Sequence, residues 1–276
     1  MSNQERVTEH YAHGDLLSVI TSGITQLGKT LDTVTIEDLA PVDEFHIGGR
    51  RASEDFLDQL GLSDQHHLLD VGCGLGGTAR FVADRYKCRV TGIDLTAEYI
   101  DTGKVLCSWV GLDDRIALHQ GSALSLTFDD STFDGAYMMH VGMNIEAKAN
   151  LFSEIFRVLR HGALFGVYDV MRIGEGELTY PVPWATSSAT SAVATPEQYK
   201  DGLQNAGFTV DAERNRHGFA VDFFEQLRTK TVASKERPPL GLHILMGDTA
   251  PIKVKNMIEN ISTSRIAPVE LIARKV

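Results

Sequence analysis

Short apolar runs alternate with helical patterns between residues 67 and 170, and this alternation constrains the fold more than any other feature of the chain. The runs typical of strands are 67–71, 88–94, 116–120, 133–139 and 163–170. Helical patterns follow the first, second and fourth of these runs. Strands that alternate with helices in this way form a mostly parallel sheet with helices on both faces. The pattern therefore predicts an α/β fold with a Rossmann-like, doubly wound sheet.

The chain extends beyond this alternating region at both ends. Residues 1–64 have mainly helical patterns and are predicted to form a cap beside the sheet. The core is predicted over residues 65–216, with a further strand at 208–213. Residues 217–264 again carry helical patterns and are predicted to form an insertion on the substrate side. A final core strand is expected within 265–276, running antiparallel to the others.

Two local signals predict where helices of the core begin and end. The segment Thr195-Pro196-Glu197-Gln198 has the pattern of a capping box with proline at the first helical position. A helix should therefore begin there and stop near Gly207. Gly162 follows the apolar face of an earlier helix and is predicted to stop it, because glycine readily adopts the left-handed conformation common at helix ends.

Composition and charge exclude several functions. The 276 residues carry a formal net charge of −11, which does not suit a nucleic-acid or anionic-membrane surface. No apolar run approaches the roughly 20 residues of a membrane span, and the polar start is not typical of a signal peptide. The three cysteines form no CxxC pair and no metal ligands cluster, so we expect no metal and a reduced, cytoplasmic setting. We expect a small-molecule partner, and a homo-oligomer is compatible with these features.

The segment LLDVGCGLGGTARF at 68–81 predicts a strand, a glycine loop and a helix. Missing β-carbons let a ligand touch the backbone, and a helix N-terminus offers free N–H groups. Gly72, Gly74 and Gly77 match the dinucleotide fingerprint, and Asp94 follows 20 residues after Gly74. NAD and S-adenosylmethionine both present ribose hydroxyls to such an acid, so the glycines alone do not separate these two ligands.

Asp70 separates the two ligands. A carboxylate that faces a pyrophosphate would be repelled, whereas one near a sulfonium and an α-ammonium is attracted. Residues 70–77, DVGCGLGG, resemble motif I of class I S-adenosylmethionine-dependent methyltransferases. The wider chain resembles the sarcosine/dimethylglycine methyltransferase type of this class. That resemblance is carried by Tyr11 and by the segments 42–62, 139–145, 154–170, 180–185 and 241–247.

The resemblance implies how S-adenosylmethionine, and its product S-adenosylhomocysteine, would be held. Gly72 and Gly74 would let the cofactor approach, and Asp70 would hold the loop and the methionine end. Asp94 would accept hydrogen bonds from both ribose hydroxyls, and Leu95 would lie against the adenine. The remaining cofactor contacts would be Ser122 and Ala123 near the adenine (relatives often have an acid in place of Ser122), His140 between cofactor and acceptor, and Tyr11 over the cofactor.

Three residues are candidate bases for the transfer. Methyl transfer needs alignment and exclusion of water, and an amine acceptor must be neutral when it attacks. His140 and Asp169 are predicted at the ends of strands, at the sheet edge where ligands bind in open α/β folds. His243, in the insertion, is a third candidate and would also contact the acceptor. A purely structural role is the alternative for each.

Three further residues are candidates for the acceptor site. Tyr180 and Trp184 would bound a pocket and attract a methylated ammonium group, with about 0.5–2 kcal/mol from each ring. Arg172 would pair with a carboxylate on the acceptor. The alternatives are a lid packed by aromatic residues and a solvated arginine.

These observations predict a small-molecule methyltransferase that acts on an amine such as a glycine derivative. One alternative is a C- or O-methyltransferase of a lipid, isoprenoid, polyketide or quinone-type intermediate. A second is a non-catalytic cofactor-binding protein, and an NAD-dependent oxidoreductase is a more distant one. The first alternative would be favoured if the apolar residues of the insertion lined the acceptor site instead of only packing. These are Phe219, Phe223, Phe224, Leu240, Leu242, Ile244, Leu245 and Met246.

Overall fold

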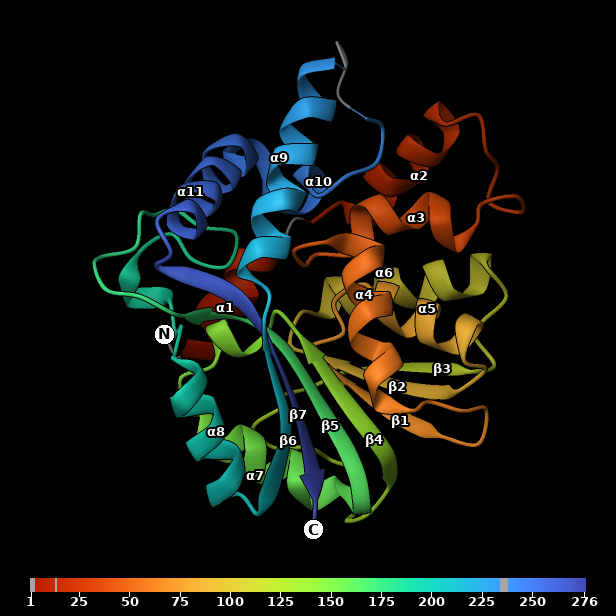
Figure 1. The fold of residues 1–276 in the computed structure, drawn as a ribbon. Coiled ribbons are helices and arrows are strands. Elements are labelled where there is room, and N and C mark those ends of the chain that lie inside the picture. The colour runs from red at the N-terminus through yellow and green to blue at the C-terminus, as the bar shows by residue number, and fades with distance from the viewer. Residues whose placement is uncertain (1–2, 13, 234–237) are drawn as a thin grey trace.

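A single seven-stranded sheet forms the centre of the computed structural model, which describes residues 3–12, 14–233 and 238–276 (Figure 1). The strands are β1 (His67–Val71), β2 (Arg89–Asp94), β3 (Ile116–Gln120), β4 (Phe133–Met139), β5 (Leu159–Arg172), β6 (Phe208–Asn215) and β7 (Ile266–Lys275). Their order in the sheet is β3-β2-β1-β4-β5-β7-β6, and only β7 runs antiparallel to its neighbours. The predicted Rossmann-like fold with an antiparallel last strand is therefore confirmed.

Helices pack on both faces of the sheet and bury its inner strands between two apolar layers, whereas the edge strands β3 and β6 are largely exposed. One layer contains side chains of α4 (Gly49–Leu57), α5 (Gly77–Arg85) and α6 (Ala97–Trp109). The opposite layer contains side chains of α7 (Lys148–Val158) and α8 (Pro196–Asn205). This arrangement follows from the alternation of strands and helices, because each helix must bury its apolar face against the sheet.

The remaining helices gather beyond the carboxyl ends of the parallel strands (Figure 1). They are α1 (Asn3–Tyr11), α2 (Leu16–Gln26), α3 (Ile36–Asp43), α9 (His217–Ala233), α10 (His243–Met246) and α11 (Ala250–Ser262). None of the helices in the described part of the chain is long and apolar enough to cross a membrane. The division into cap, core, insertion and final strand follows these elements but stays a prediction.

The two local signals had different outcomes. The capping box is present, because Thr195 Oγ accepts from the Gln198 backbone N–H and Gln198 Oε1 accepts from that of Thr195. The prediction that Gly162 ends a helix is wrong. That helix, α7, ends at Val158, and the chain passes directly into β5 because Leu159 pairs with Phe133 of β4. Gly162 has a φ of 81° inside β5, next to an irregularity in the β4–β5 register.

Candidate active site

The first cavity, of about 350 Å³, lies at the carboxyl ends of β1, β2 and β4. The glycine loop between β1 and α5 forms one wall, and the backbone N–H groups of Gly72 and Cys73 both donate to the Ile93 carbonyl at the end of β2. All nine residues predicted to contact a cofactor line this cavity. They are Tyr11, Asp70, Gly72, Gly74, Asp94, Leu95, Ser122, Ala123 and His140.

Asp94 holds the glycine loop against the end of β2. Its Oδ2 accepts from the Gly74 backbone N–H at 3.0 Å, and its Oδ1 accepts from the Thr96 N–H at 2.8 Å. Burial raises the pKa of this carboxyl, and those two backbone N–H groups oppose the rise. The carboxylate therefore fixes the wall of the cavity that it also lines.

Helix α1 covers the far side of this cavity. Gln4 Nε2 donates to Ser122 Oγ at 2.7 Å, which ties the helix to the loop after β3. Tyr11, at the end of α1, donates to Asn144 Oδ1 at 3.4 Å, and Asn144 belongs to the segment after β4. The N-terminal helix thus bridges two loops at the sheet edge, and the contact of Tyr11 with a cofactor stays a prediction.

A second cavity, of about 540 Å³, adjoins the first. Side chains from α3, α9, α11 and the segment 238–246 line it. Four residues line both cavities: Tyr11, Phe45, His46 and His140. A ligand in the first cavity and one in the second would therefore meet at these four side chains.

Apart from His140, which lines both cavities, the predicted acceptor and base residues fall into two groups. Trp184 and His243 line the second cavity, whereas Asp169, Arg172 and Tyr180 line neither cavity. Asp169 is fully buried within β5 and accepts from the Tyr199 hydroxyl at 2.7 Å. Arg172 donates to the carbonyls of Gly174 and Gly176. Tyr180 packs against an apolar cluster with Trp184.

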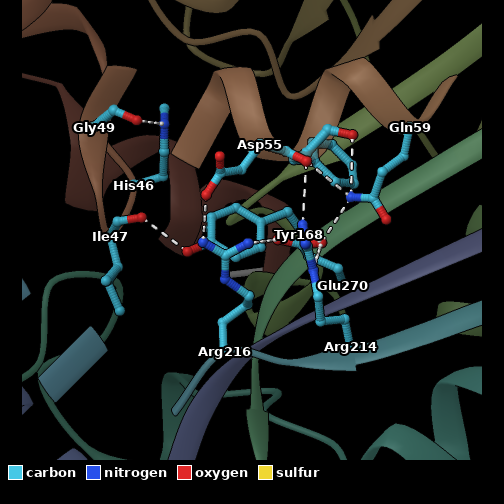
Figure 2. Close-up of polar contacts among 10 residues, drawn as sticks. His46, Ile47, Gly49, Asp55, Gln59, Tyr168, Arg214, Arg216 and Glu270 are labelled. Carbon is cyan, nitrogen blue, oxygen red and sulfur yellow. Dashed lines mark hydrogen bonds and ion pairs between the residues drawn. The ribbon is translucent and has the colours of Figure 1, made fainter. Parts of the chain in front are cut away.

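An ionic cluster around the buried Glu270 ties α4 to the sheet (Figure 2). Glu270 of β7 is 1% exposed and pairs with Arg214 at 2.6 Å and Arg216 at 3.0 Å. Gln59 donates to the same carboxylate, and Arg216 also pairs with Asp55 of α4 at 2.8 Å. These contacts fix α4, and with it the preceding segment 44–48, against β6 and β7.

Three hydrogen bonds among Tyr168, Ile47 and His140 hold the segment 44–48 on its other side. The Tyr168 hydroxyl donates to the Ile47 carbonyl at 2.8 Å (Figure 2), and the Ile47 N–H donates to His140 Nε2 at 3.2 Å. His140 Nδ1 in turn lies 3.2 Å from the Tyr168 carbonyl. His140 has a φ of 57°, an uncommon backbone conformation for a residue other than glycine. His140 thus joins the end of β4 to the segment that carries His46.

Phe45 and His46 belong to the site but were not predicted from the sequence. They lie in the segment 42–62 that carries part of the family resemblance, but nothing in their spacing assigns them to the site. Only the tertiary return of the segment 44–48 to the end of β4 brings them to the junction of the two cavities.

Comparison with known proteins agrees with this geometry. A protein-family model described as "Methyltransferase domain" matches residues 68–162, which span β1 to the start of β5. Residues 68–162 are a methyltransferase domain. The match supports the predicted methyltransferase class, and the fold is that of a geranyl diphosphate methyltransferase structure in complex with S-adenosylmethionine, which agrees with the predicted cofactor.

Among similar proteins, 24-methylenesterol C-methyltransferase 2 of Oryza sativa subsp. japonica is 34% identical over 220 residues. The match covers 78% of this chain and 56% of the rice protein, so the chain spans about half the length of that relative.

Solved structures share the fold at lower identity. Geranyl diphosphate C-methyltransferase from Streptomyces coelicolor A3(2) has a TM-score of 0.73 at 17% identity, over 100% of this chain and 98% of that one. A Galdieria sulphuraria protein described as a sarcosine dimethylglycine methyltransferase has a TM-score of 0.65 at 18% identity, over 82% and 85%. The narrower resemblance to the sarcosine/dimethylglycine type is therefore one of several within the same fold.

Asp70 of the methyltransferase domain fits a cationic ligand. Its side chain is 3% exposed and lines the first cavity, and its Oδ2 has no hydrogen-bond partner among the described residues. Burial raises the pKa of Asp70 to about 8, and the negative charge of Asp94 adds to the rise. A sulfonium or α-ammonium placed beside it would favour the ionised carboxylate. Asp70 and the glycine loop would therefore hold the methionine end of S-adenosylmethionine.

Replacing Asp94 with alanine should lower the affinity for S-adenosylhomocysteine about tenfold or more, which is about 1.4 kcal/mol. The change removes the carboxylate that holds Gly74 and Thr96 and that would accept hydrogen bonds from the ribose hydroxyls. Calorimetric titration measures the affinity, and Asp101→Ala, on the exposed side of α6, is the matched control. Equal affinities of the two variants would contradict the ribose assignment.

Proposed function

We propose that this protein transfers the methyl group of S-adenosylmethionine to a carbon atom of a neutral, largely apolar, unsaturated small molecule. The observation that carries the proposal is the second cavity, which meets the cofactor cavity at His46 and His140. This is the alternative acceptor class of the sequence analysis, and we favour it over a glycine derivative.

Apolar side chains dominate the wall of the second cavity. Five of the eight apolar residues noted in the insertion line it: Phe223, Phe224, Leu240, Leu242 and Met246. Leu245 lines the first cavity instead. These side chains therefore line a cavity and do not only fill the core of a lid. They would stabilise an apolar acceptor by removing its surface from water.

The charges around the second cavity do not suit an anionic acceptor. Its ionisable side chains, within the described ranges, are Tyr11, Asp38, Glu44, His46, His140 and His243, with no lysine or arginine among them. A carboxylate or diphosphate would need a cationic partner there. Arg172, the predicted partner of a carboxylate, bonds to two backbone carbonyls away from the cavity. A neutral acceptor is the chemistry that this wall fits.

The names of similar proteins support transfer to carbon. The rice relative is a 24-methylenesterol C-methyltransferase, and the Streptomyces coelicolor structure is a geranyl diphosphate C-methyltransferase. S-adenosylmethionine supplies a methyl group that its sulfonium already activates. The chain has to align the acceptor carbon with that methyl and exclude water, and alignment alone supplies about 7–11 kcal/mol.

Methyl-labelled S-adenosylmethionine and a set of matched acceptors would test the proposal. We expect label in a 24-methylenesterol or in geraniol, more than in geranyl diphosphate, and none in glycine, sarcosine or dimethylglycine. Geraniol and geranyl diphosphate share one hydrocarbon chain and differ in charge, so their comparison tests the neutral cavity directly. Label in the glycine series, or in none of the acceptors, would overturn the proposal.

Replacing Val254 with phenylalanine should impair use of the acceptor and spare the cofactor. Val254 lies on α11 and lines only the second cavity, so a larger side chain would occupy acceptor space. We expect KM for the acceptor to rise about tenfold, with the affinity for S-adenosylhomocysteine within about twofold of the parent. Ile252→Phe is the matched control, because Ile252 is exposed on the same helix. An equal KM for both variants would contradict the assignment of this cavity.

A further inference from the structure

His46 has a hydrogen-bonding state that the backbone fixes. Its Nε2 lies 3.2 Å from the Gly49 carbonyl oxygen (Figure 2) and 3.0 Å from Ser53 Oγ. A carbonyl oxygen only accepts, so Nε2 carries the hydrogen and Nδ1 keeps its lone pair. No described residue forms a hydrogen bond with Nδ1, and the side chain lines both cavities. His46 therefore offers a proton acceptor at the junction.

His140 has the opposite arrangement, and both of its ring nitrogens are engaged. The Ile47 N–H donates to Nε2, which is therefore unprotonated, and Nδ1–H donates to the Tyr168 carbonyl. The two rings lie 6.1 Å apart, centroid to centroid. Of these two neighbouring histidines, His46 is the one whose unprotonated nitrogen no backbone group occupies.

We propose that Nδ1 of His46 accepts the proton that an unsaturated acceptor loses after one of its carbons has been methylated. This inference rests on the proposed function, and it names the base of that same site. His140, which the sequence analysis gave as a candidate base, holds the segment that carries His46.

The proposed step balances in atoms and electrons. The π pair of the acceptor forms the new carbon–carbon bond to the methyl group, and the carbon–sulfur bond breaks with its pair retained by sulfur. The acceptor is left with a cationic carbon. A C–H bond on a neighbouring carbon then gives its proton to His46 Nδ1, and its electron pair forms a new double bond. His46 becomes an imidazolium whose Nε2–H still donates to Gly49.

The surroundings of His46 suit a base that takes a proton from a C–H bond beside a cationic carbon. Burial lowers the pKa of His46 to about 4, so the ring is neutral and weakly basic at pH 7. A weak base suffices for the acidic C–H beside a cationic carbon and is poorly matched to an ammonium group. The Glu44 carboxylate lies 3.9 Å from Nε2 and would attract the imidazolium, although its pairing with Arg50 at 2.8 Å reduces that attraction.

Nitrogen NMR of the ring tests the geometry without an acceptor. Long-range ¹H–¹⁵N spectra of the full chain with S-adenosylhomocysteine, at pH 7, report which nitrogen of each imidazole carries hydrogen. We expect hydrogen on Nε2 of His46 and on Nδ1 of His140, and the His46→Gln spectrum assigns the His46 signals by their loss. Hydrogen on Nδ1 of His46, or an imidazolium, would overturn the proposal whatever the activity.

His46→Gln tests the role in turnover, because the amide can still donate to Gly49 but provides no basic nitrogen. With the acceptor that the parent chain methylates, we expect formation of the new alkene to fall at least about hundredfold. Affinity for S-adenosylhomocysteine should stay within about threefold of the parent. Without the base, water could add to the cationic carbon. An increased share of methylated alcohol among the products would therefore indicate that the base is absent.

The outcomes of the turnover test separate the two proposals. His161→Gln, an exposed histidine outside both cavities, is the control. If His46→Gln turns over as fast as this control, the base role fails while the proposed function stands. If the parent chain methylates none of the acceptors, the proposed function fails, and the base role fails with it.

Discussion

Replacing Arg80 with methionine is expected to lower the free energy of unfolding by about 3–5 kcal/mol. Arg80, on α5 beneath the glycine loop, is 0% exposed and pairs with Asp43 of α3. Its Nη1 also donates to the Leu75 carbonyl at 2.8 Å. Methionine would leave the Asp43 carboxylate buried without its cation, and burial already raises the pKa of that carboxyl. Urea unfolding followed by circular dichroism gives the free energy.

Arg85→Met is the matched control for this prediction. Arg85 lies on the same helix but is exposed, and its pairing with Asp58 at 3.2 Å is screened by water. We expect little change in its unfolding curve. The double variant Arg80→Met, Asp43→Leu removes both buried charges and should recover most of the loss. If Arg80→Met unfolds like Arg85→Met, the buried pair does not stabilise the fold.

The same ion pair should affect the cofactor site. Asp43 lines the first cavity, and Arg80 holds the Leu75 carbonyl of the glycine loop. Loosening of this loop would move Gly72 and Gly74 relative to Asp94. Affinity for S-adenosylhomocysteine in Arg80→Met should therefore fall even at temperatures where the variant is folded.

Features that depend on neighbouring residues were predictable from the sequence. The capping box of α8 is an exchange between two residues three apart, so its residue types suffice to locate it. The cofactor cavity was also predictable, because strand, glycine loop and Asp94 must meet at one sheet edge once the sheet is parallel. The other predicted cofactor residues, Tyr11 among them, were assigned from the family resemblance, and they line the same cavity.

Features that depend on distant pairing were not predictable in the same way. Asp169 was predicted at the end of a strand over 163–170, but β5 continues to Arg172 because it pairs with β7, and Asp169 lies opposite Val269. Its side chain is therefore buried under the site and lines neither cavity. His46 was missed for a related reason. The position of its segment depends on hydrogen bonds between its neighbour Ile47 and two residues far along the chain, Tyr168 and His140.

Replacing Gly72 with alanine is expected to lower the affinity for S-adenosylhomocysteine at least about hundredfold, or about 2.7 kcal/mol. Gly72 has a φ of 73°, which costs another residue about 1–2 kcal/mol. An added β-carbon would lie 2.4 Å from Val141 Cγ2, so the glycine loop and the end of β4 would have to separate. Both walls belong to the cofactor cavity, and calorimetric titration measures the loss.

Gly111→Ala isolates the cause of that loss. Gly111 has a similar φ of 66°, but an added β-carbon there has no atom within 4 Å, and the residue lies outside both cavities. Both variants should lose stability to backbone strain, whereas only Gly72→Ala should lose cofactor affinity. Equal affinities would mean that the loop adapts to a β-carbon, and the close approach of Gly72 to Val141 would then not shape the cofactor site. A loss in Gly72→Ala alone would indicate that this contact sets the distance between the glycine loop and Val141, at the end of β4.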